Sequence, residues 1–276
     1  MNINLLLITL IIFSCIFFNK ISFRFGIPTL FVFILLGMAF GSDGFARISF
    51  DNFALSETVC SVALIYIMFY GGFGTNWKMA RPVARQSILL STAGVFLTAL
   101  FLGLFLFLLL RRELWLCFLT GSTLASTDAA SVFSVLRSRK LDLKENTASI
   151  LELESGSNDP MAYMLTLVCL SFLTGKADVG SILRLLTAQL VFGIAIGVLC
   201  GLLSYRILKS VSFEVDGFDV IFIAGIALFS YALSAALGGN GYLSTYLTGI
   251  ILGNVKMSGK KNIVHFFDGL TGLMQI

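Results

Sequence analysis

Apolar segments of membrane-spanning length recur along almost the whole chain, and short polar connections separate them. A helix needs about 20 predominantly apolar residues to cross the hydrocarbon core of a bilayer. A tenth apolar run begins near Ile263 and is too short to span by itself. The pattern therefore predicts an all-α polytopic membrane protein with about nine transmembrane helices and a partial tenth. The predicted spans cover residues 3–18, 28–41, 55–73, 87–110, 114–136, 148–174, 182–204, 218–237 and 242–255.

Composition and charge fit a membrane protein. Hydrophobic residues make up 57% of the chain and charged residues 12%, whereas soluble domains carry about 25% charged residues. If the N-terminus lies outside, 14 of the 19 Lys and Arg residues fall on the inner side, as the positive-inside rule expects. The net charge of +4 then follows from topology, and no nucleic-acid partner is implied. These inner residues are Lys20, Arg24, Lys78, Arg81, Arg85, Arg137, Arg139, Lys140, Lys144, Arg206, Lys209, Lys256, Lys260 and Lys261.

The cysteines and the single histidine give no sign of a metal site or a cofactor. The five cysteines stand alone inside apolar runs, without disulfide or metal-binding spacing, so we expect them to be buried packing residues. His265 has no second histidine or nearby cysteine with which to bind a metal, and no nucleophile motif accompanies it. We therefore expect no enzymatic activity. The five cysteines are Cys15, Cys60, Cys117, Cys169 and Cys200.

The segment Glu152–Pro160 places acids and an amide at the start of an otherwise apolar span. Ionisable groups within a membrane are costly and usually mark ion or proton pathways. On a helix, Glu152, Ser155 and Asp159 would face one shared space, with Asn158 beside that face. Because proline lacks an N–H, Pro160 would free a backbone carbonyl, and these oxygens together suit a hard monovalent cation. The alternative is a helix that begins here, with Asn158 or Ser157 as its cap.

A second polar stretch, residues 121–131, lies midway through the fifth span. Its small residues favour close helix packing, but Asp128 within a span needs a partner or water. Transporters bind substrates and coupling ions where membrane helices are interrupted. We therefore expect a helix break at Thr127 and Asp128. Two glycine-rich stretches, residues 71–74 and 238–241, are interpreted as turns.

These two polar stretches resemble those of the bacterial NhaP-type monovalent cation:proton antiporters. The resemblance rests on Ser126-Thr127-Asp128-Ala129-Ala130, followed about thirty residues later by Glu152–Pro160, and it extends over essentially the whole chain. It implies that Asp159 binds the cation and the proton alternately and that Asn158 steadies the site. It further places Thr127 and Asp128 in an unwound helix. It places Ser155 and Glu154, as site residues, in the helix that carries Asp159.

The resemblance also implies a fold, which this chain departs from in two respects. The family has an NhaA-like fold of two inverted repeats of about six helices, and the chain covers the first repeat and the start of the second. We expect residues 1–276 to form one incomplete transmembrane exchanger domain. The second departure is Tyr70, at a position where many relatives carry an acid. The resemblance further implies a homodimer in the bacterial inner membrane, surrounded by lipid, with no cofactor.

The function implied is secondary active exchange of K⁺ or Na⁺ for H⁺, with no resident metal. Competition of the cation and the proton for Asp159 would couple their fluxes, and the Asn-Asp pair implies electroneutral exchange. One alternative is a transport-incompetent fragment of such an antiporter. Another is an intramembrane aspartyl protease, but neither Asp128 nor Asp159 follows the Gly-x-Gly sequence expected of that class.

Overall fold

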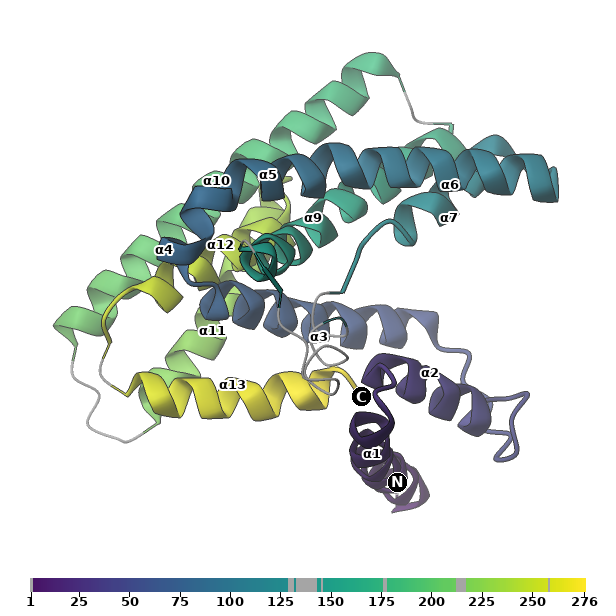
Figure 1. Ribbon diagram of the computed structural model, residues 1–276, viewed down its shortest axis with the longest axis horizontal. Helices are drawn as coiled ribbons and strands as arrows, with labels where there is room; N and C mark the ends of the chain where they lie inside the picture. Colours follow the sequence, from purple (N-terminus) through teal and green to yellow (C-terminus); the bar gives the residue numbers. More distant parts are fainter. Residues whose placement is uncertain are drawn as a thin grey trace.

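Helices make up the regular structure in the described part of the chain, and that part contains no strand. The computed structural model describes residues 2–128, 132, 143–144, 146–175, 178–211, 217–257 and 259–276. Figure 1 shows the helices as a bundle, with α1 and α2 packed against each other at its edge. The helices are α1 Asn2–Phe25, α2 Thr29–Phe40, α3 Phe53–Gly74, α4 Trp77–Ala80, α5 Ala84–Leu89, α6 Val95–Leu110, α7 Leu114–Thr123, α9 Thr147–Leu173, α10 Val179–Ser210, α11 Phe218–Ala236, α12 Gly241–Asn254 and α13 Lys260–Met274.

All the predicted spans except the second half of the fifth correspond to observed helices, which confirms an all-helical membrane protein. Within the described residues, five helical segments are long and apolar enough to cross a membrane. The polar first half of α9 lowers its mean hydropathy, so this 27-residue helix is not one of the five. The fifth predicted span is helical only to Thr123, and beyond Asp128 it lies largely outside the described residues. The five segments are Leu5–Ser22, Phe53–Gly74, Trp77–Leu110, Val179–Ser210 and Phe218–Ala236.

The fourth span is one helical run with two local changes in winding. Pro82 lies in a 3₁₀ turn, Arg81–Val83, near the start of a helical segment, where its missing N–H is tolerated. A π-helical turn follows at Leu90–Gly94, just before α6. Between these changes, the buried Ser87 donates to the carbonyl oxygen of Ile150 at 3.3 Å. This contact fixes α5 against the beginning of α9.

Two groups of helices meet at α9. One core joins α3, α11, α12 and α13 and includes Leu153 of α9. A smaller core joins α6, the segment after α7, and Ala162 of α9. Helix α10 packs along α11 and α12, as Figure 1 shows. Because α9 contributes to both cores, its acidic segment is held where the two groups of helices face each other.

The two glycine-rich stretches have different structures. Gly238 has φ +78° and lies in the turn between α11 and α12, which confirms the predicted turn. The expected turn at residues 71–74 is wrong, because these residues end helix α3. At Gly72, an added Cβ would lie 2.2 Å from the carbonyl oxygen of Tyr246. Glycine is used there because the backbones of α3 and α12 approach closely.

The cysteines follow the predicted burial with one exception. Cys15, Cys117, Cys169 and Cys200 are buried free thiols. Cys60 is exposed, so the expectation of burial is wrong for this residue. It lies in the first half of α3, on the side of that helix that faces away from the buried residues Ile65, Met68 and Phe69.

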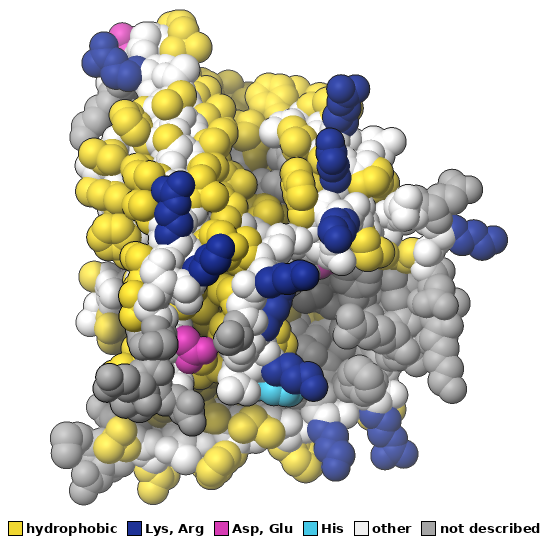
Figure 2. Space-filling model, turned by 90° about the vertical axis from the view of Figure 1, so that its left-hand side faces the viewer, with side chains coloured by type: hydrophobic (Ala, Val, Ile, Leu, Met, Phe, Trp, Pro, Cys, Tyr) yellow, Lys and Arg dark blue, Asp and Glu magenta, His cyan; other side chains and the backbone are white. Residues whose placement is uncertain are grey.

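Basic side chains gather on one side of the molecule. Figure 2 shows this side, on which α4, the C-terminal end of α10 and the N-terminal end of α13 lie in Figure 1. These elements carry Lys78, Lys209 and Lys260, three of the residues predicted to lie inside. We call this side the basic face. Three further residues predicted to lie inside, Arg137, Arg139 and Lys140, lie outside the described residues.

Candidate functional site

The acidic segment Glu152–Pro160 lies inside a continuous helix. Helix α9 begins at Thr147, so Asn158 and Pro160 are interior residues. The alternative in which Asn158 or Ser157 caps a new helix is therefore wrong. Asn158 is fully buried, and Asp159 and Glu154 are partly buried. A fully buried amide in a membrane helix needs partners from another element, and the segment after α7 supplies them.

Helix α7 ends as expected before Thr127 and Asp128. After Thr123 the chain makes a turn at Leu124, and residues 125–128 are not helical. Ala125 is 2% exposed and packs with Val95 and Ala99 of α6 and Ala162 of α9. This anchor presents the polar residues that follow to the face of α9 that carries Asn158.

Thr127 is the centre of the hydrogen bonds that join this extended segment to α9. The Asn158 amide donates to the Thr127 carbonyl oxygen at 3.2 Å and to its hydroxyl at 2.5 Å. The Ser155 hydroxyl donates to the same carbonyl oxygen at 2.9 Å. The Thr127 hydroxyl donates to the Glu154 carboxylate at 3.1 Å. The structure thus brings Thr127, Glu154, Ser155 and Asn158 together.

Asp159 meets the extended segment through Ser126. The Ser126 hydroxyl donates to the Asp159 carboxylate and lies 3.2 Å from the side-chain oxygen of Asn158. The charges of Asp128 and Glu154 act on Asp159, so three acids share one electrostatic environment. Such a concentration of negative charge is stabilised by a bound proton or cation.

Ser126 is a site residue that the sequence reasoning did not single out. It belongs to the same polar run as Thr127 and Asp128, so the run itself carried the signal. Glu152, by contrast, was expected to share the space of Ser155 and Asp159. Glu152 takes no part in the hydrogen bonds described above. The negative charge of its carboxylate instead acts electrostatically on the hydroxyl of Tyr246 in α12.

Almost all the polar atoms gathered here are oxygen atoms that could bind a cation. Carboxylates, hydroxyls and a backbone carbonyl are the ligands that hard cations prefer. In the described part of the chain, no three His, Cys, Asp or Glu side chains are placed to hold a metal ion. The arrangement thus offers carboxylate, hydroxyl and carbonyl oxygens of the kind that bind a hard cation.

Tyr70 lies away from these groups. Its hydroxyl donates to the carboxylate of Asp268, and its ring stacks on Phe267 at a centroid distance of 6.0 Å. Both partners belong to α13. Tyr70 thus ties α3 to α13.

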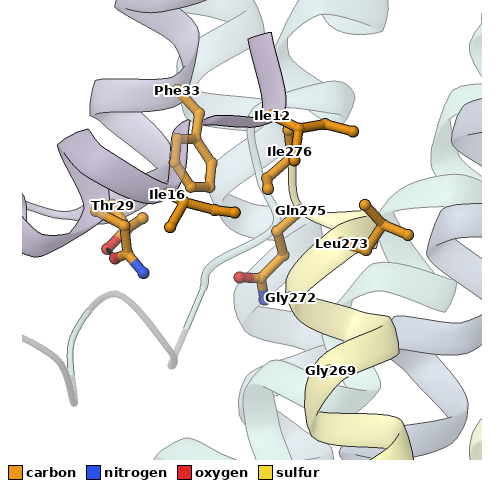
Figure 3. Close-up of a pocket in the computed structure, with 10 residues that line it drawn as sticks. Ile12, Ile16, Thr29, Phe33, Gly269, Gly272, Leu273, Gln275 and Ile276 are labelled. Carbon is orange, nitrogen blue, oxygen red and sulfur yellow. Dashed lines mark hydrogen bonds between the residues drawn. The ribbon is translucent and has the colours of Figure 1, made fainter. Parts of the chain in front are cut away.

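A separate cavity of about 400 Å³ lies between the N-terminal helices and the end of α13. Figure 3 shows Ile16 of α1 and Phe33 of α2 on one side, and Leu273 and Gln275 at the end of α13 on the other. None of its lining residues belongs to the group around Thr127, Asn158 and Asp159.

A family comparison matches nearly the whole chain. Residues 6–275 fit the model described as "Sodium/hydrogen exchanger, transmembrane". Two curated relatives give the same picture. A K(+)/H(+) antiporter NhaP of Alkalimonas amylolytica is 34% identical over 276 residues, which is 100% of this chain and 48% of the relative. A K(+)/H(+) antiporter NhaP2 of Shewanella sp. (strain ANA-3) is 35% identical over 261 residues, 94% of this chain and 45% of the relative. The chain thus spans about half the length of these relatives.

A solved structure supports the fold. The electron-microscopy structure of the sodium proton antiporter MjNhaP1 from Methanocaldococcus jannaschii superposes with a TM-score of 0.81. The match covers 100% of this chain and 68% of that chain at 23% identity. Likeness at this identity shows a shared arrangement of helices over that part.

Proposed function

The chain belongs to the sodium/hydrogen exchanger family, a family of transporters, and from this premise we propose that it exchanges K⁺ or Na⁺ for H⁺ across a membrane. The observation that carries the proposal is the contact of Ser126 and Thr127 with Asn158 and Asp159. It joins an interrupted helix to an acid inside a membrane-spanning one. K⁺ is the first cation to test, because the two relatives described above are named as K(+)/H(+) antiporters.

In the proposed cycle Asp159 holds either a proton or the cation. When Asp159 releases its proton, its carboxylate and nearby oxygens of Ser155 and Thr127 receive the cation. Asn158 keeps the extended segment against α9, and Glu154 orients Thr127. Asp128 adds negative charge that favours the cation. One carboxylate cannot hold both ions, so the fluxes are coupled one for one and exchange is electroneutral.

The wider assembly is part of the same proposal. Residues 1–276 form one exchanger domain that holds the first repeat of an NhaA-like inverted-repeat fold and the start of the second. The domain lies as a homodimer in the bacterial inner membrane with its N-terminus outside. The support for this orientation is the basic face, which the positive-inside rule places in the cytoplasm.

Antiport is tested in vesicles that contain the full chain and a pH-sensitive dye. Addition of K⁺ or Na⁺ should reverse an imposed pH gradient, and Asp159→Asn should reduce this to the level of empty vesicles. Asp51→Asn, at an exposed acid in a connection, is the matched control and should leave exchange unchanged. Unchanged exchange with Asp159→Asn would contradict the assignment, and no exchange with the unmodified chain would favour the transport-incompetent alternative.

A further inference from the structure

One acid on α9 is not used by the site. Glu152, Gly156 and Asp159 follow one another at i, i+4 and i+7 spacing and therefore share a face of the helix. Glu152 is exposed, whereas Asp159 is partly buried. Seven residues correspond to about 10 Å along a helix. Glu152 thus lies about two turns from Asp159, closer to the start of α9.

Tyr246 of α12 rests on the helix between these two acids. A Cβ added to Gly156 would lie 2.5 Å from both the hydroxyl oxygen and a ring carbon of Tyr246. Only glycine at this position lets the phenol lie directly on the backbone of α9. Tyr246 is 2% exposed, so its hydroxyl is held inside the protein against the face that carries Glu152 and Asp159.

The Tyr246 hydroxyl is buried and makes no hydrogen bond to any described residue. The hydroxyls of Thr75 and Ser157 are its polar neighbours, and the charge of Glu152 acts on it. Both neighbouring hydroxyls donate elsewhere: Thr75 to the carbonyl oxygen of Gly71 at 2.9 Å and Ser157 to that of Leu153. Three hydroxyl oxygens therefore lie together where the charge of the Glu152 carboxylate acts on them.

We propose that the hydroxyls of Tyr246, Thr75 and Ser157, with the carboxylate of Glu152, form a second subsite for the transported monovalent cation. Hydroxyl and carboxylate oxygens are the donors that a hard cation prefers. The ion would satisfy the lone pairs of a buried hydroxyl that otherwise lacks a partner. This subsite is separate from Asp159 and its partners, and it rests on the proposed function.

The position of Thr75 shows on which side of Asp159 the second subsite lies. Thr75 caps the C-terminal end of α3, and α4 follows at once with Lys78. Figure 1 shows α4 on the side that Figure 2 presents as the basic face. The second subsite lies between that face and Asp159, so it receives cations that move between the two. Glu152 supplies negative charge to this subsite.

The transport test uses substitutions that keep side-chain size. Glu152→Gln and Tyr246→Phe should raise the KM for the cation about threefold to tenfold, the change expected when one polar ligand is lost. The maximal rate at saturating cation should stay within about twofold. Glu57→Gln and Tyr242→Phe are the matched controls, because Glu57 is an exposed acid of α3 and Tyr242 lies one turn before Tyr246 on α12. An unchanged KM, or a fall in maximal rate alone, would overturn the subsite.

A binding test separates the subsite from transport itself. We would measure the rise in unfolding temperature of the full chain in detergent when KCl replaces choline chloride at constant ionic strength. Asp159→Asn, which should abolish antiport, should retain a smaller cation-dependent rise. Adding Glu152→Gln or Tyr246→Phe to Asp159→Asn should remove that remainder, whereas adding Tyr242→Phe should not. If Asp159→Asn retains no rise, or if the added substitutions leave it unchanged, the second subsite is wrong whether or not the chain transports.

Discussion

The side-chain amide of Asn158 donates to both the carbonyl oxygen and the hydroxyl of Thr127, at 3.2 Å and 2.5 Å. Asn158 is an interior residue of α9, and Thr127 lies in the non-helical segment after α7. Backbone groups at membrane depth need partners inside the protein, because lipid offers none. The Asn158 amide provides one where α7 is interrupted, and the same contact joins the two polar stretches of the sequence.

Asn158→Ala should destabilise the protein by about 1–3 kcal/mol, because the Thr127 oxygens lose a buried donor. Unfolding by a denaturing detergent, followed by circular dichroism, measures this. Thr166→Ala is the control, since the Thr166 hydroxyl donates only within α9, to Ala162, at 2.9 Å. Equal effects of the two substitutions would show that the Asn158–Thr127 contact does not stabilise the fold.

Gly156→Ala should destabilise the protein by about 1–3 kcal/mol, the cost of overpacking a filled contact. The added methyl group would meet the Tyr246 ring at 2.5 Å. Gly71→Ala is the matched control: it lies in α3 with no atom within 4 Å of the new Cβ, and replacing a helical glycine there should stabilise by about 0.5–1 kcal/mol. Opposite signs of the two changes in unfolding free energy are expected. A stabilising Gly156→Ala would contradict the close approach of α12 to α9.

Asn240→Ala should cost about 2 kcal/mol, roughly twice the loss of a helix cap alone. The Asn240 side chain caps α12 by accepting from the N–H of Leu243, and it donates to the carbonyl oxygen of Pro160 in α9 at 3.0 Å. Asn52→Ala, at an exposed cap of α3, removes only a cap and should cost about 1 kcal/mol. Similar losses for both would indicate that the bond from α12 to α9 adds no stability.

The beginning of α10 should loosen in acid. The Ser181 hydroxyl and backbone N–H bond to Asp178, and with Arg184 they lower the pKa of this exposed carboxyl below its ordinary value. A carboxyl with a lowered folded pKa stabilises the helix above its unfolded pKa of about 3.9, and this is lost as pH falls through the folded pKa. Amide exchange at Ser181 and Ile182 should therefore quicken below about pH 4. Asp178→Asn should make exchange there independent of pH after correction for the intrinsic rate, and a retained pH step would exclude Asp178 as its cause.

The sequence by itself determined that the chain is an all-helical membrane protein, and it indicated which residues form the candidate site. Apolar runs of about 20 residues form helices in a bilayer, so the order of the helices could be read from the sequence. Nine spans were predicted, whereas five helical segments of the described residues are long and apolar enough to cross a membrane. The same cost of polar groups in lipid singled out Asp128, Asn158 and Asp159. It also indicated the interruption before Thr127, because a run of small and polar residues cannot sustain an apolar membrane helix.

Only the tertiary structure decided which residues from distant helices complete these features. Tyr246 contacts Gly156 of α9, although more than 80 residues separate the two in the sequence. Asn240 contacts Pro160 of α9 across 80 residues of sequence. Their own surroundings in the sequence resemble ordinary helix and turn residues. Residues 71–74 had the composition of a turn, yet they end helix α3, and Gly72 among them packs closely against α12. The local sequence shows which residues are costly to place in lipid. Which residues of two distant helices contact each other depends on how the surfaces of those helices pack, and the local sequence does not contain that information.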